Sequence, residues 1–123
     1  MCVRMKTHKD LDVWKLGISL VKDVYILTSQ FPKSENYGLS SQMQRCSVSI
    51  PSNIAEGAAR QGKKEYIHFL YISLGSLAEL ETQIIIAKEV SYTNDILYFE
   101  KNIEELRRKL LGFINYLKKD MQK

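Results

Sequence analysis

The sequence is poor in residues that interrupt helices or cross-link a chain. Its 123 residues include only six glycines, two prolines and two cysteines. With so few helix breakers, long helices can form, and no segment has the biased composition of a disordered linker. Cys2 and Cys46 lack the C-x-x-C spacing of zinc and redox motifs, so we expect reduced thiols with a structural role.

Long apolar runs are also absent. No segment approaches the roughly 18 uninterrupted apolar residues that indicate a membrane-spanning helix. The basic residues of segment 1–10 are not followed by the apolar stretch of a secretory signal. We therefore expect a cytoplasmic protein that has no membrane partner.

Common catalytic and nucleotide-binding motifs are missing as well. There is no G-x-x-x-x-G-K-[ST] loop, no G-x-G-x-x-G turn and no H-E-x-x-H pair. Glu65 and His68 have the Glu-x-x-His spacing of di-iron bundles, but such a site needs a second copy. The other histidine, His8, has Met5 three residues before it, which cannot complete the ligand set. The sequence predicts no metal, no cofactor and no catalytic residues.

Apolar residues recur at steps of three and four along most of the chain, which is the pattern of amphipathic helices. The pattern predicts one domain over 1–123, an all-α antiparallel up-and-down four-helix bundle. A kink is expected in the second helix, because Pro51 cannot donate to the carbonyl of Ser47. In the last helix we expect Leu110, Phe113 and Leu117 to face the core. The predicted helices span about 11–31, 39–59, 63–90 and 95–121.

The helix expected at 63–90 has a very wide apolar surface. Leu70 and Leu77 belong to the seam expected to face the core. Tyr71 and Ile85 belong to a second apolar set, which lies about 100° round the same helix. Because one bundle core does not need both sets, the second set indicates burial against another subunit. The sequence thus favours a homo-oligomer.

The chain is basic, with 18 Lys and Arg against 14 Asp and Glu, a formal charge of +4 and a pI near 9.0. Such a balance permits nucleic-acid binding without demonstrating it. Two basic clusters could contact phosphates, particularly in an oligomer that repeats them. They are Arg60, Lys63 and Lys64 in the turn before the third helix, and Arg4, Lys6 and Lys9 near the start of the chain.

The segments 45–57 and 75–81 combine small residues with charged ones. This composition favours close helix packing, and a ligand groove is the alternative. In a hairpin that turns near residue 62, Arg45 falls opposite Glu79. We therefore expect an ion pair that bridges the second and third helices. The residues of these segments for which we expect a structural role are Arg45, Ser49, Pro51, Asn53, Glu56, Gly57, Gly75 and Glu79.

The same segments carry a resemblance to a known family. The stretch from Ser49 to Gly57, followed by Gly75 to Glu81, resembles the bacterial 23S ribosomal RNA intervening-sequence proteins, and Leu11 to Lys15 and Gln44-Arg45 fit the same pattern. The resemblance covers about 11–117 and implies an antiparallel four-helix bundle that assembles into a homopentamer. That family is similar to the accessory variability determinant of diversity-generating retroelements, a basic pentamer that binds nucleic acid and a reverse transcriptase.

The sequence therefore favours a non-enzymatic homo-oligomer that binds structured RNA or DNA through repeated Lys and Arg side chains. The alternative is a scaffold that docks a protein partner on an apolar or mixed-charge face of the bundle. A third hypothesis is an enzyme with a polar pocket around Glu56, His68 and Glu79.

Overall fold

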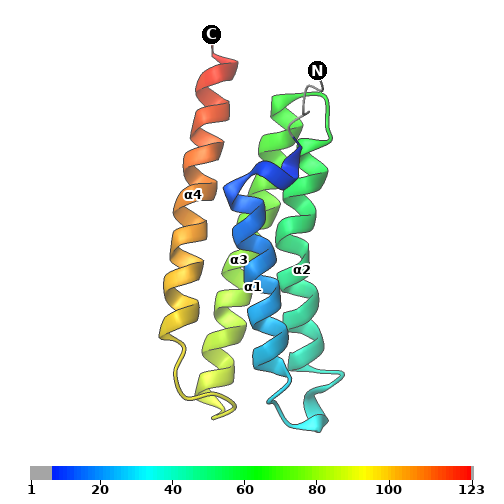
Figure 1. Cartoon of the computed structure of the whole chain (residues 1–123), viewed down its shortest axis with the longest axis vertical. Coiled ribbons are helices and arrows are strands. Elements are labelled where there is room, and N and C mark those ends of the chain that lie inside the picture. Colours follow the sequence, from blue (N-terminus) through cyan, green and yellow to red (C-terminus); the bar gives the residue numbers. More distant parts are fainter. Residues whose placement is uncertain (1–6, 123) are drawn as a thin grey trace, which may run out of the picture.

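Four long helices make up most of the computed structural model, which describes residues 7–122 (Figure 1). This part of the chain contains no β-strand, which confirms the expected all-α, four-helix fold. The helices are α1 (Asp12–Thr28), α2 (Leu39–Ala58), α3 (Lys63–Glu89) and α4 (Leu97–Met121), with short 3-10 helices η1 (His8–Asp10) before α1 and η2 (Lys33–Glu35) before α2.

Successive helices run in opposite directions (Figure 1). The contacts between α2 and α3 follow this direction: Cys46 Sγ donates to the carbonyl of Ser76, and one turn further along α2 the carbonyl of Ile50 accepts from Ser73 Oγ. Around the bundle, α2 contacts α1 and α3, and α4 contacts α3 and α1. The fourth helix therefore packs beside the first, which closes the bundle.

The core consists of aliphatic side chains from all four helices. Along α3 the buried residues follow the seam expected from the sequence, including Leu70 and Leu77. In α4 the expected face is rotated slightly, because Ile114 is fully buried whereas Phe113 is only partly buried and packs edge-on against Tyr66. The largest fully buried side chains are Val24, Met43, Ile50, Ile54, Leu70, Leu77, Leu80, Ile84, Ile103, Leu106, Leu110 and Ile114.

The first helix ends earlier than the sequence suggests. It reaches Thr28 rather than residue 31, and Ser29 forms its cap. The hydroxyl of Thr28 donates to the carbonyl of Tyr25, and that of Ser29 donates to the carbonyl of Ile26, so side chains bond to the last turn. Phe31 lies outside the helix, as expected for a residue that precedes proline. Its side chain nevertheless stays buried.

Close packing surrounds Pro51, where α2 continues without interruption. Pro51 is buried against α1, and a Cβ on Gly17 would lie 3.3 Å from the Cβ of Pro51. Within α2, Ser49 Oγ donates to the carbonyl of Cys46, and Asn53 Nδ2 donates to the carbonyl of Ser49. The small polar side chains thus bond to their own helix and leave its surface free for packing. The kink at Pro51 stays a prediction.

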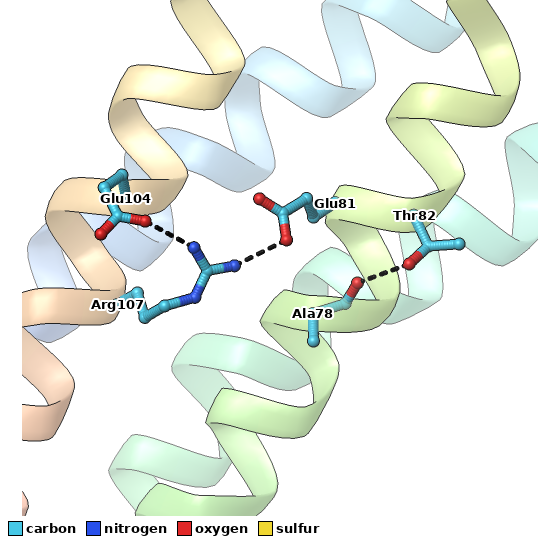
Figure 2. A network of polar contacts seen from close by, with 5 residues as sticks. All are labelled: Ala78, Glu81, Thr82, Glu104 and Arg107. Atoms are coloured by element: carbon cyan, nitrogen blue, oxygen red, sulfur yellow. Dashed lines mark hydrogen bonds and ion pairs between the residues drawn. The ribbon is translucent and has the colours of Figure 1, made fainter. Parts of the chain in front are cut away.

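A partly buried ion pair in the middle of the bundle joins α3 to α4 (Figure 2). Arg107 of α4 contacts Glu81 of α3 through Nη2 at 2.7 Å, and it contacts Glu104 of its own helix through Nη1 at 2.6 Å. Arg107 and Glu81 are both partly buried. A guanidinium that bonds two carboxylates in this position fixes the register of α3 against α4.

The ion pair expected between Arg45 and Glu79 is not formed. Both residues are exposed, and neither has a charged partner among residues 7–122. The register of α2 against α3 is as expected, but the rotation of α2 about its own axis is not. Cys46, rather than Arg45, points across to α3, and one residue along a helix corresponds to a rotation of about 100°. Arg45 therefore points toward solvent.

The outer surface of α3 is apolar and largely uncovered. By length and composition alone, α3 is the one helix of the described chain that could cross a membrane, yet only 33% of its most apolar 18-residue window is buried. Tyr71, Ile72, Ile85 and Ile86 are between 38% and 45% exposed. Of the second apolar set expected from the sequence, Tyr71 and Ile85 thus lie outside the core of the single chain. Two other members of that set do not, because Ile67 is buried in the core and Leu74 packs against it.

Candidate nucleic-acid interface

Arg60, Lys63 and Lys64 lie at the end of the bundle where α2 turns into α3 (Figure 1). The same end holds η1 with Lys9, the start of α1 and the last turns of α4. An ion pair between Lys63 and Asp120 ties the first turn of α3 to the last turns of α4. The fold thus places Lys9, from the basic cluster near the start of the chain, at the same end of the bundle as Arg60, Lys63 and Lys64.

Arg60 is held by its neighbours at the turn. Its Nη2 atom lies 2.7 Å from Glu56 Oε1, and its Nε atom lies 3.9 Å from Glu65 Oε2. The guanidinium also lies over the ring of Phe69, 5.0 Å from the ring centroid. These ion pairs are solvent-exposed and so contribute little to stability. They nevertheless compensate the positive charge of Arg60, which lowers its value as a phosphate ligand.

The cations without charged partners at this end come from both α3 and α4. Lys64 is exposed in the first turn of α3, and Lys119 is exposed near the end of α4; within residues 7–122 neither forms an ion pair. Lys118 Nζ donates to the hydroxyl of Tyr71 at 2.7 Å and lies over the same ring, again without a carboxylate. Lys64, Lys118 and Lys119 therefore remain available to an anionic partner.

Lys118 and Lys119 are not among the basic residues expected from the sequence to contact phosphates. A usable signal was present, because in an up-and-down bundle the end of the fourth helix lies beside the start of the third. Of the residues near the start of the chain, Lys9 is exposed in η1. Arg4 and Lys6 lie outside the described residues.

A shallow hollow of about 430 Å³ opens beside the turn. Its lining combines two cations, Arg60 and Lys64, with an aromatic ring, Phe69, and also includes Glu65 and His68. Proteins often hold single-stranded or looped nucleic acid by combining cations with aromatic rings on which bases stack. Here Phe69 is partly buried and Arg60 already lies over its ring. The carboxylate of Glu65 opposes phosphate binding within the hollow, so the lysines around it are the stronger contacts.

The structure does not bring together the polar pocket of the enzyme hypothesis. Glu56 and His68 lie near the turn, whereas Glu79 is about 16 Å further along α3, at 1.5 Å per helical residue. Within residues 7–122, no three His, Cys, Asp or Glu side chains lie close enough to hold a metal ion.

Cys46 is a buried thiol at the contact between α2 and α3. Its Sγ atom lies 3.1 Å from the carbonyl oxygen of Ser76. Burial, followed by the negative charge of nearby Glu79, raises the pKa of Cys46 from 9.0 to about 12. The thiol therefore stays protonated at neutral pH, as a hydrogen-bond donor rather than a nucleophile.

This pKa predicts a loss of stability in alkali. The unfolded thiol ionises near pH 9.0 and the folded thiol near pH 12, so its contribution is complete below pH 9 and is lost between pH 9 and 12. Between pH 8 and 10, urea titrations should show the wild type losing on the order of 1 kcal/mol more than Cys46→Ala. Other titrating groups cancel in this difference, and parallel pH profiles would contradict the assignment.

A comparison with curated proteins finds no match for the chain. A family model described as 23S rRNA-intervening sequence protein matches residues 9–112. The match includes the turn with Arg60, Lys63 and Lys64, and it ends before Lys118 and Lys119. Because it spans most of the 123 residues, it confirms the resemblance carried by the two small-residue segments. The chain belongs to the family of 23S rRNA-intervening sequence proteins.

Proposed function

We propose that this protein is a non-enzymatic homo-oligomer that binds structured RNA or DNA through lysines repeated at one end of each bundle. The family is one of small helical proteins and is not a known enzyme family. Its name refers to sequences that interrupt a ribosomal RNA gene, which makes ribosomal RNA the first nucleic acid to test.

One observation carries the nucleic-acid part of the proposal. Lys64, Lys118 and Lys119 converge on the end of the bundle at which α3 begins and α4 ends, and none of them has a charged partner among residues 7–122. Arg60 and Lys63, the cations favoured by the sequence, are already paired with carboxylates. Unpaired cations gain more from phosphate contacts, because no protein ion pair has to be broken first.

The exposed face of α3 supports the oligomeric part. Exposed apolar patches of this kind are typical of surfaces that bind another protein. Glu79 and Glu81 lie in the middle of α3, where a carboxylate would be costly in the centre of a lipid bilayer. A protein surface is therefore the better cover for this helix. The resemblance described above suggests five copies, and a ring would repeat the three lysines along one rim.

The test compares two triple variants that remove the same charge from opposite ends of the bundle. Lys64, Lys118 and Lys119 become alanine in the first variant. In the control, alanine replaces Lys33, Lys88 and Lys101, which are exposed without charged partners at the other end. Binding of a structured ribosomal RNA fragment is followed by fluorescence anisotropy at several salt concentrations, and light scattering checks that both variants keep the oligomeric state of the wild type.

We expect the wild-type affinity to fall steeply with salt, because binding releases counterions from the nucleic acid. The first variant should bind at least about tenfold more weakly, with a salt slope smaller by roughly 0.7–0.9 for each phosphate that it no longer neutralises. The control should bind like the wild type. Equal losses in both variants, or binding that ignores salt, would exclude this surface. An oligomer that does not bind RNA or DNA would favour the protein scaffold instead.

A further inference from the structure

We propose that copies of this chain join head to tail, with the outer face of α3 in one copy packed into the groove between α1 and α2 of the next. In this interface Glu79 of one copy pairs with Arg45 of its neighbour. The inference rests on the proposed assembly and specifies its surfaces. It starts from two apolar surfaces that differ in shape and in charge.

The first surface is a groove. Gly17 allows α1 to approach Pro51 closely, and beside this contact a hollow of about 320 Å³ opens between the helices. Two of its apolar side chains, Ile18 and Val48, are 44% and 39% exposed. Its apolar lining is Trp14, Ile18 and Val21 from α1 and Val48, Pro51 and Ala55 from α2. The groove can therefore receive apolar side chains from a partner.

The second surface is a ridge on α3. Ile72, Gly75, Glu79, Thr82 and Ile86 follow one another at steps of three and four and are all exposed. This spacing forms a straight seam on the outside of the helix, like the seam of a coiled coil. A Cβ on Gly75 would meet nothing within 4 Å, so a partner helix can approach closely at this point.

The charges on the two surfaces are complementary. The ridge carries Glu79, and Glu89 lies near the end of the same helix; neither has a charged partner in the described part of the chain. Lys15, Lys22 and Arg45, on the helices that form the groove, are exposed and equally without ion pairs within residues 7–122. Docking the ridge into the groove brings unpaired carboxylates to unpaired cations, which favours this pairing over others.

The register explains why Glu79 and Arg45 are the pair. The hydrogen bonds of Cys46 with Ser76 and of Ile50 with Ser73 place Arg45 at the height of Glu79 along the bundle. In a ring whose axis is parallel to the bundles, copies are related by rotation without a shift along that axis. Residues at equal height then meet between copies. The two charges can thus pair across the interface although they do not pair within one chain.

A symmetric contact between two copies of α3 is disfavoured by the same residues. Glu79 lies at the middle of the ridge, between Ile72 and Ile86, so a two-fold axis there would bring two carboxylates together. Like charges at the centre of an interface destabilise it. Contact between two different surfaces avoids this repulsion. It forms a closed ring when a whole number of the rotations between neighbours adds up to 360°.

Charge reversal tests the pairing. Glu79→Arg and Arg45→Glu are made singly and together, and light scattering behind size exclusion gives the oligomeric state of each. We expect either single change to weaken association at least about 100-fold. The double variant should restore the oligomer, because every interface then contains the reversed pair. Glu100→Arg, an equal charge change at an exposed position of α4, should stay oligomeric. Circular dichroism verifies that all variants are helical.

The outcomes separate this inference from the proposed function. If single reversals leave the wild-type oligomer intact, or if the double variant stays dissociated, the pairing of Glu79 with Arg45 is wrong while assembly stands. If the wild type itself is monomeric over the whole concentration range, both the assembly and this interface are wrong.

Discussion

Gly57→Ala is expected to lower the free energy of unfolding by about 1–3 kcal/mol, the usual cost of overpacking a closely packed site. Gly57 is buried near the end of α2, where it faces the first turns of α3. A Cβ at this position would lie 2.9 Å from the Cβ of Phe69 and 2.9 Å from Cδ1 of Tyr66. It would also lie 3.2 Å from the backbone oxygen of Tyr66. Because Cβ and backbone atoms cannot swing aside, the two helices would have to separate.

The matched control is Gly112→Ala. Gly112 is exposed in α4, and a Cβ there would meet nothing within 4 Å. Alanine should therefore stabilise the protein by about 0.5–1 kcal/mol, because it lowers the conformational entropy of the unfolded chain. Urea unfolding of both variants measures the two effects, which are expected to have opposite signs. A gain in stability for Gly57→Ala would show that α2 and α3 are not in close contact at this end.

The close approach at Gly57 also positions the candidate interface. Tyr66, which packs over Gly57, makes an edge-on contact with Phe113 of α4, with ring centroids 5.3 Å apart. Through these contacts the end of α2, the start of α3 and the last turns of α4 form one packed unit. This unit fixes the backbone positions of the lysines of α3 and α4 relative to one another, so no backbone ordering is needed when they bind a phosphate backbone.

The helices could be predicted because their apolar spacing is regular. In α4, Leu110 and Leu117 are buried as the three-and-four pattern requires. The pattern failed in detail at Phe113, because 3.6 residues per turn do not divide evenly into a seven-residue repeat. Along this stretch of α4, Ile114 takes the buried position and Phe113 moves to the edge of the core.

The site could be predicted less well, since it depends on the rotation of each helix about its own axis. The length of the turn gave the register of α2 against α3 but not that rotation. Small polar residues around Pro51 weaken the apolar periodicity of α2, so the sequence did not show that Cys46, rather than Arg45, faces α3. Charge pairing was equally hidden. Only the folded chain shows that Arg60 and Lys63 have carboxylate partners while, within residues 7–122, Lys64 does not.

The rotation of α4 can be tested with two neighbouring leucines. Leu110 is fully buried, whereas Leu111 is 41% exposed. Leu110→Ala should lower the free energy of unfolding by about 2–5 kcal/mol, because it removes buried methyl groups and leaves a cavity among the side chains of the core. Leu111→Ala should cost less than about 1 kcal/mol, because its side chain is already partly in water.

Both changes remove the same atoms from the same helix, so helix propensity affects both variants alike. The difference between them therefore reports burial alone. Urea unfolding is measured at a protein concentration at which the wild type is monomeric, which excludes any contribution from contacts between copies. Equal losses in the two variants would mean that α4 does not present Leu110 to the core. The positions of Lys118 and Lys119 would then be wrong as well, since the same rotation of α4 places them at the candidate interface.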